Sequence, residues 1–393
     1  MVLTAAEAEA LRRPAVARLW SAEADAAPVE GASGPDPLEA AGPLVRIRRR
    51  ADGACGFLAA DGACRIHAEH GAARKPIACR LFPFSLRPGE GAALVTASFS
   101  CPTVAANAGA PLTGQIGELQ ALGKEWRRSF PEAAWPLRFT AGKPLTGAVV
   151  GEMRQALMGV LQRRTQDGRR DLRRNTARLC ALLEDWTRHR VLKLPADDFA
   201  EYVRLTGRFA VTSDKPVPPQ VPSRVGRLLL RGFLLAVVAA RLQAEGPRRG
   251  LRLRLRARTV RVALHLHGLW APAEGVDRRA VRRVRVSLDE PAIEALVYHF
   301  LRSALETLPT GRRPLLDELC FAYATLETAL QLAAMRAARA GRETVAAEDL
   351  LAGITETADL AQTAGDGALE GFLRTLTGGL DAARSFAHAS SGA

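Results

Sequence analysis

Four of the six cysteines in this 393-residue chain lie between positions 55 and 101, at Cys55, Cys64, Cys79 and Cys101. Cys55 and Cys64 each follow a Gly-Ala pair, and Cys101 precedes a proline, so these thiols lie beside turn residues. Short, stiff loops can direct thiolates toward one point, and four sulfurs complete a tetrahedral zinc site or hold an iron–sulfur cluster. We therefore expect these cysteines to bind a zinc or iron ion or an iron–sulfur centre.

The histidines nearest to this cluster are His67 and His70, three positions apart on a predicted short helix. They would face one side of that helix and could supply imidazole ligands, with His67 as a further candidate ligand beside the four cysteines, whereas a pair of surface histidines is the favoured alternative. The spacing C-x8-C-x14-C-x21-C differs from the paired C-x-x-C of zinc fingers, so four unrelated buried thiols remain the alternative. Cys180 and Cys320 stand alone in helical segments and are expected to be buried apolar residues.

The composition predicts a globular, mainly helical protein. Apolar residues make up 48% of the chain and charged residues 24%, and the abundant alanine, leucine and arginine favour helices. The start of the chain lacks the pattern of a signal peptide, and the strongest apolar run, residues 228–240, is interrupted by Arg231 and is too short to cross a bilayer. We expect a cytoplasmic protein with reduced thiols and no membrane partner.

The formal net charge of +14 makes nucleic acid a candidate partner, because clustered arginine and lysine bind phosphate and release its counterions. No aromatic-rich RNA-binding motif or helix-turn-helix pattern accompanies the charge. A generally basic surface is therefore the favoured interpretation, and a nucleic-acid partner is not favoured. The alternating segment 251–258 (LRLRLRAR) predicts a strand whose arginines either line a phosphate-binding edge or, the favoured alternative, form a solvated face.

The predicted elements place the chain in the mainly α class. Residues 1–110 are expected to form a small cysteine-rich domain, irregular or α+β, with a strand in 92–99. Residues 111–222 form a helical region that ends in a proline-rich connection, and residues 223–393 form a C-terminal helical domain. Helical spacing of apolar residues predicts helices over 115–129, 147–164, 171–188, 223–242, 291–308 and 315–340. Ser287 with Glu290 is expected to form a capping box, and Thr344 to cap one further helix.

The segment CGFLAADGACRIHAEHGAARKPIACRLFPFSL contains the elements C-x-F-L, C-x-I-H and K-P-x-x-C-R-x-F-P in that order. It resembles the core of the YkgJ-type cysteine-cluster proteins, which are described as zinc- or iron-chelating and are related to flagellin lysine N-methylases. The later Ser100-Cys101-Pro102 resembles an S-C-P element of the methylase branch. The matching positions are Cys55, Phe57, Leu58, Cys64, Ile66, His67, Lys75, Pro76, Cys79, Arg80, Phe82 and Pro83.

The resemblance covers about 50 residues and implies a metal-chelating function for the four cysteines. In the methylase branch it implies a protein lysine N-methyltransferase that uses the cluster, with S-adenosylmethionine as methyl donor and a protein as substrate. A basic interaction module with a structural metal site is a further alternative. Arg80 is expected to lower the pKa of the neighbouring thiol.

The family signature C-x-x-C-x-x-C-C, which is followed in the family by a stretch like V-x-L-T-x-x-E, is missing from this chain. The chain opens with Met1-Val2-Leu3-Thr4-Ala5-Ala6-Glu7 and so resembles the family from just after the signature. We expect either a start placed too late or a natural truncation. The four cysteines would then hold a metal alone or as half of a larger site.

Overall fold

The computed structural model describes residues 2–21, 36–41, 44–50, 54–88, 93–129, 137–215, 278–307, 314–363, 383–384 and 386. These residues fall into two compact units. The cysteine unit comprises the described parts of 2–86 and 110–129, and the helical unit comprises those of 87–109 and of 137 onward. The predicted helix at 223–242 and the predicted strand at 251–258 lie outside the described residues.

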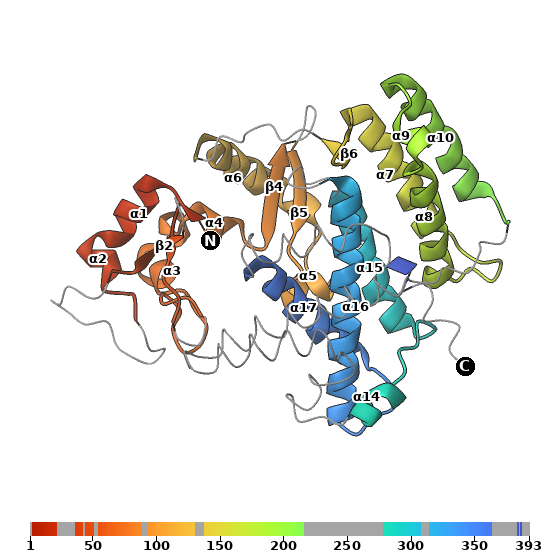
Figure 1. Ribbon diagram of the computed structural model, residues 1–393. Coiled ribbons are helices and arrows are strands. Elements are labelled where there is room, and N and C mark those ends of the chain that lie inside the picture. Colours follow the sequence, from red (N-terminus) through yellow and green to blue (C-terminus); the bar gives the residue numbers. More distant parts are fainter. Residues whose placement is uncertain are drawn as a thin grey trace, which may run out of the picture. The chain divides into compact units, whose positions relative to one another are not determined.

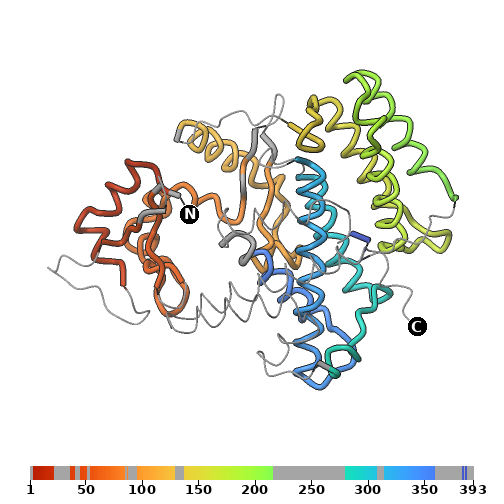
Figure 2. The backbone as a smooth tube through the Cα atoms, in the orientation of Figure 1, coloured from red at the N-terminus to blue at the C-terminus, as the bar shows by residue number. Residues whose placement is uncertain are grey.

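The cysteine unit combines short helices with one small sheet (Figures 1 and 2). Its antiparallel sheet has the strand order β1-β3-β2, and Leu38 lies opposite Ile47. Two apolar clusters hold the unit together: one buries Leu3, Leu11 and Phe57, and the other joins helices α4 and α6. Its elements are β1 (Val2–Leu3), α1 (Ala5–Arg12), α2 (Pro14–Ala17), β2 (Leu38–Ala41), β3 (Leu44–Ile47), α3 (Arg65–His70), η1 (Ala72–Arg74), α4 (Ile77–Leu81), η2 (Leu112–Gln115) and α6 (Ile116–Ser129).

Strand β4 (Phe84–Pro88) crosses from the cysteine unit into the helical unit after Leu86 and pairs with β5 (Ala93–Ala97). The helical unit is otherwise built from helices and one two-stranded sheet, β6–β7. Its further elements are α5 (Pro102–Ala105), β6 (Arg138–Thr140), β7 (Lys143–Pro144), α7 (Gly147–Leu161), α8 (Leu172–Trp186), α9 (His189–Leu192), α10 (Ala196–Thr212), α14 (Arg278–Arg283), α15 (Pro291–Thr307), α16 (Leu315–Arg339) and α17 (Ala347–Thr363).

The mainly α class predicted from the sequence is confirmed. The helices predicted at 115–129, 147–164, 171–188, 291–308 and 315–340 correspond to α6, α7, α8, α15 and α16, and the strand predicted in 92–99 is β5. Two predicted caps are wrong. The Ser287 hydroxyl accepts a hydrogen bond from the amide of Asp289 instead of that of Glu290, and Thr344 pairs with Arg285 in a β-bridge before α17 begins. None of the described helices is long and apolar enough to cross a membrane.

Helix α16 is the centre of the helical unit (Figure 1). Burial extends around the whole helix, so its polar side chains need partners inside the core. The hydroxyl of Tyr323 lies 3.1 Å from that of Thr176 on α8, and burial raises the pKa of this phenol. Burial also raises the pKa of Glu327 to about 7, an effect that the charge of Arg173 partly opposes. Glu327 is therefore held mainly in its neutral form below pH 7.

A Glu327→Gln variant tests whether burial raises the pKa of Glu327. Because the folded state holds the carboxyl proton up to about pH 7 and the unfolded chain loses it near pH 4.5, the wild-type protein loses stability between these values. The neutral amide avoids this loss, so the variant should match the wild type at pH 4 and exceed it by up to about 3 kcal/mol at pH 8. Urea unfolding followed by circular dichroism measures the difference, with the exposed Glu348→Gln on α17 as control. A pH-independent gap between variant and wild type would contradict the assignment.

Candidate functional sites

Three of the four clustered cysteines lie in the cysteine unit and pack against the same apolar cluster. Cys55 is held by a β-bridge to Arg49, and Cys64 by a bridge to Leu58 just before helix α3. Cys79 lies in the short helix α4. All three are half-buried and are close enough for their charges to interact. The sequence grouping therefore does bring three thiols into one region.

The loop that carries Cys55 is fixed by a close approach to Trp20. A side chain on Gly56 would overlap the Trp20 indole, so only glycine fits there. The Gly56 carbonyl accepts a hydrogen bond of 2.9 Å from the amide of Ser21, and the Trp20 indole donates one of 3.2 Å to the carbonyl of Arg48. The chain thus reaches Cys55 along a tightly packed path, and Phe57 turns into the core beside it.

The electrostatic surroundings favour neutral thiols. Burial raises the pKa of Cys79 to about 12, and the neighbouring Cys55 and Cys64 add to the shift while Lys75 opposes it. Burial also raises the pKa of Cys55, against a hydrogen bond from the backbone of Phe57. A nucleophile must be a thiolate, and these two groups hold their protons at neutral pH. Their setting is that of apolar core residues.

The predicted metal site is wrong for the residues that the structure describes. Cys101 lies in the helical unit, where it precedes helix α5, whereas the other three thiols lie in the cysteine unit. His67 is exposed on α3, and the His70 ring lies 3.4 Å from the carbonyl of Ala15. Among the described residues, no three Cys, His, Asp or Glu side chains are placed to hold a metal ion. The binding of a metal or an iron–sulfur centre by Cys55, Cys64, Cys79 and Cys101 is therefore overturned.

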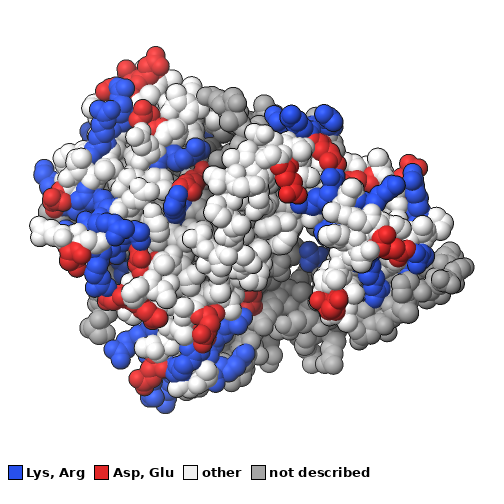
Figure 3. Space-filling model, turned by 180° about the vertical axis from the view of Figure 1, so that it is seen from behind, with Lys and Arg blue, Asp and Glu red and all other residues white. Residues whose placement is uncertain are grey.

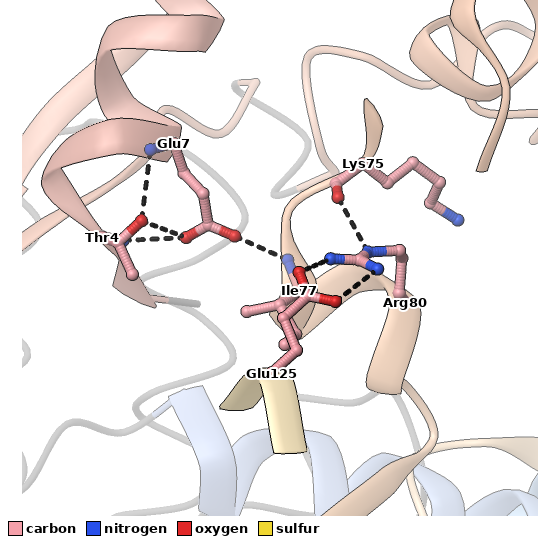
Figure 4. Close-up of polar contacts among 6 residues, drawn as sticks. All are labelled: Thr4, Glu7, Lys75, Ile77, Arg80 and Glu125. Carbon is pink, nitrogen blue, oxygen red and sulfur yellow. Dashed lines mark hydrogen bonds and ion pairs between the residues drawn. The ribbon is translucent and has the colours of Figure 1, made fainter. Parts of the chain in front are cut away.

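The matched sequence elements have a structural role instead (Figure 4). One oxygen of the Glu7 carboxylate accepts hydrogen bonds from the amide and the hydroxyl of Thr4, at 2.8 and 3.0 Å. Its other oxygen accepts one of 2.6 Å from the amide of Ile77, at the start of α4. Because Thr4 and Glu7 form the capping box of α1, the same carboxylate joins α1 to the K-P-x-x-C-R element.

Arg80 fixes the other side of helix α4. Its guanidinium pairs through two nitrogens with the carboxylate of Glu125 on α6, and its Nε donates a hydrogen bond of 3.2 Å to the carbonyl of Lys75. Arg80 was predicted to lower the pKa of Cys79, but the charge that acts on this thiol in that direction is that of Lys75. Neither Glu7 nor Glu125 was among the residues predicted to build this site, although the T-x-x-E spacing of Thr4 and Glu7 is a capping-box signal.

Comparisons of the chain with protein-family models, with curated proteins and with solved structures gave no match. The functional interpretation therefore depends on the chain's own residues. The methylase interpretation used the same cysteine cluster and loses its basis together with the metal site.

A second candidate site is a row of arginines at the end of the helical unit. Helix α14 and the residue two positions beyond it carry four exposed arginines, here called the arginine ridge: Arg279, Arg282, Arg283 and Arg285. Val281, Val284 and Val286 alternate with them and pack against the apolar core, which directs the arginines outward. Helix α14 lies at the lower end of Figure 1, and blue side chains gather with some red ones at the lower end of Figure 3.

The arginine ridge is anchored by backbone pairing. Arg285 donates a hydrogen bond of 2.8 Å to the carbonyl of Glu343 and accepts one of 3.1 Å from the amide of Val345. The side chains of Arg282, Arg283 and Arg285 form no ion pair with another described residue, whereas Arg342 nearby is paired with Asp349. Arg282, Arg283 and Arg285 therefore present charge that the described part of the chain leaves uncompensated.

A Glu7→Ala variant tests the joint between α1 and α4. The change removes three hydrogen bonds from one carboxylate and leaves the amide of Ile77 without its acceptor, so we expect the cysteine unit to lose about 1–3 kcal/mol of stability. Hydrogen exchange of the full chain should show faster exchange in both α1 and α4. Glu9→Ala, an exposed change on the same helix, is the control. Exchange that accelerates only in α1 would argue against the joint.

Alkylation by iodoacetamide tests whether the Cys79 thiol keeps its proton in the folded protein. With a pKa of about 12, Cys79 should react at pH 8 at least a hundredfold more slowly in the native protein than in urea, since the thiolate is the reactive form. Mass spectrometry of the modified peptide measures both rates. Prior incubation with Zn²⁺ should leave the native rate unchanged. If zinc slows the alkylation of Cys79, and this protection disappears in a Cys55→Ser, Cys64→Ser variant, the cysteines do bind a metal ion.

Proposed function

We propose that this chain binds nucleic acid through the phosphate backbone, using the arginine ridge. The observation that carries the proposal is the exposed, anchored row of Arg282, Arg283 and Arg285, which forms no ion pair within the described part of the helical unit. Arginine suits such contacts because its planar guanidinium stays charged and matches phosphate oxygens through two hydrogen bonds at once.

The distribution of charge in the sequence also indicates that the binding site lies in this part of the chain. Residues 241–285 contain thirteen arginines and three acidic residues, so this stretch carries +10 of the formal net charge of +14. Elsewhere many arginines are engaged with carboxylates: Arg163, Arg170 and Arg336 pair with acidic residues of other segments of the helical unit. In the sequence, the positive charge is therefore concentrated in the segment that ends with the ridge arginines. This concentration favours a phosphate-binding site over the generally basic surface expected from the net charge alone.

The proposed binding mode is independent of base sequence. Aromatic residues make up only 5% of the chain, and Arg282, Arg283 and Arg285 are charged groups suited to phosphate. Binding of this kind is driven by counterion release and weakens steeply with salt. We therefore propose a nucleic-acid partner contacted through its backbone, with little preference between sequences.

Two further proposals concern origin and location. We propose a relationship to the YkgJ-type cysteine-cluster proteins, supported by the direct contact between the T-x-x-E and K-P-x-x-C-R elements through Glu7 and Ile77. We also propose that the chain works in the cytoplasm, supported by its six free thiols. Neither proposal carries a metal or a methyl-transfer activity with it.

An Arg282→Ala, Arg283→Ala variant tests the nucleic-acid proposal. Fluorescence anisotropy with a labelled 30-base-pair duplex and a 30-nucleotide single strand should show weaker binding of the variant at 50 mM salt. Removal of two phosphate contacts should lower the slope of log K against log salt by about 2, equally for different sequences.

The matched control is Arg190→Ala, Lys193→Ala, which removes the same charge from other exposed positions of the helical unit. We expect this control to retain the wild-type slope. If both variants weaken binding equally, only net charge matters and the arginine ridge is not the site. If the wild-type chain binds neither duplex nor single strand at 50 mM salt, the proposed function is wrong.

A further inference from the structure

The geometry points to a second binding site in the helical unit, one that takes the dianionic phosphate group of a small molecule. Three arginine side chains gather where the chain leaves α7, runs along α8 and leaves α10. Arg163 follows α7, and Arg174 and Arg178 lie four positions apart on one face of α8. Asp214, two positions beyond the end of α10, lies beside them. These four residues are here called the α8 cluster.

Hydrogen bonds and an ion pair bring the α8 cluster together. Helices α7, α8 and α10 pack against one another (Figure 1). The Arg163 guanidinium pairs with the Asp214 carboxylate at 2.8 Å, and the Arg163 carbonyl accepts a hydrogen bond of 2.9 Å from the side-chain amide of Asn175 on α8. The Arg178 guanidinium donates one of 2.7 Å to the carbonyl of Ser213, which directly precedes Asp214. The cluster therefore joins three segments that are distant in the sequence.

The charges of the α8 cluster do not balance. Arg178 is only 7% exposed, and burial lowers the pKa of its guanidinium. The positive charges of Arg163 and Arg174 lower this pKa further, and the carboxylate of Asp214 opposes them. The guanidinium of Arg174 is exposed and has no hydrogen bond or ion pair with a described residue. Three guanidinium groups and one carboxylate leave the cluster with a formal charge of +2.

The other carboxylates nearby are engaged elsewhere. Asp171 caps α8 by accepting a hydrogen bond of 2.9 Å from the amide of Arg174, and its charge acts on the guanidinium of Arg173. Asp167 lies in the loop before α8, where its charge acts together with that of Arg169. In the described chain, neither carboxylate forms an ion pair with a guanidinium of the α8 cluster. The charge of +2 is therefore left for a ligand.

A terminal phosphate group matches this charge. Guanidinium groups bind phosphate oxygens through paired hydrogen bonds and stay charged at any physiological pH. A phosphate monoester carries close to two negative charges at pH 7, because its second pKa is about 6. A phosphodiester of a nucleic-acid backbone carries one. The ligand is therefore inorganic phosphate or a small phosphate monoester, and it differs from the nucleic acid proposed for the arginine ridge.

Isothermal titration calorimetry of the full chain with inorganic phosphate, at pH 7.5 and 50 mM salt, tests the site. We expect saturable binding that an Arg174→Ala variant weakens at least fivefold. This variant should fold normally, since the exposed Arg174 guanidinium has no described partner to lose. Glycerol 2-phosphate, a monoester, should bind as phosphate does, and dimethyl phosphate, a diester, at least fivefold more weakly. Phosphate binding should weaken as the pH falls below 6, because the ligand takes up a proton while the arginines stay charged.

The matched control is Arg190→Ala, which removes the same charge from an exposed position on α9, beyond the other end of α8. This control and the Arg282→Ala, Arg283→Ala variant should bind phosphate as the wild type does. No binding at 10 mM phosphate, or equal weakening by Arg174→Ala and Arg190→Ala, would overturn the proposal. So would equal binding of the diester, or loss of phosphate binding in the variant of the arginine ridge, since the ridge would then be the phosphate site.

Discussion

The helical unit depends on the burial of helix α16 around its whole circumference. Of its 25 residues, 19 are buried, and they reach from Leu315 to Ala337. A helix that is buried on all sides cannot rotate or shift without disturbing its packing, so the neighbouring helices must pack around it. Gly353 of α17 approaches the backbone of Ala329 so closely that a side chain there would collide with it. After α16 the chain passes Arg285, and Thr344 forms a β-bridge with it. This bridge holds the arginine ridge at the end of the helical unit.

The cysteine unit depends on a different constraint: the short helix α4 is held in place by carboxylates of two other helices, α1 and α6. Helix α4 has five residues, which is too short to be stable alone, and it is held by Glu7 at its start and by Glu125 through Arg80. The elements that resemble a metal-binding family therefore build a scaffold here. The thiols of Cys55 and Cys79 belong to this scaffold as neutral, half-buried side chains.

Much of the fold follows from the sequence, because apolar residues at helical spacing mark a face that must be buried. That rule located α6, α7, α8, α15 and α16 to within three residues at each end. It failed for sites that depend on distant contacts. Grouping in sequence did not place Cys101 with the other thiols, since strands β4 and β5 carry the chain into the helical unit before it. The role of Arg80 depended on Glu125, 45 positions away, which no local pattern indicates.

Cross-linking can show whether the arginine ridge contacts nucleic acid. A duplex that carries bromodeoxyuridine on one strand, irradiated with the full chain at 50 mM salt, should give peptide–nucleotide adducts that map by mass spectrometry to residues 278–285. The adducts should disappear at 500 mM salt, where phosphate contacts are screened. Adducts spread evenly over the basic surface, or confined to the cysteine unit, would show that the arginine ridge is not the binding site.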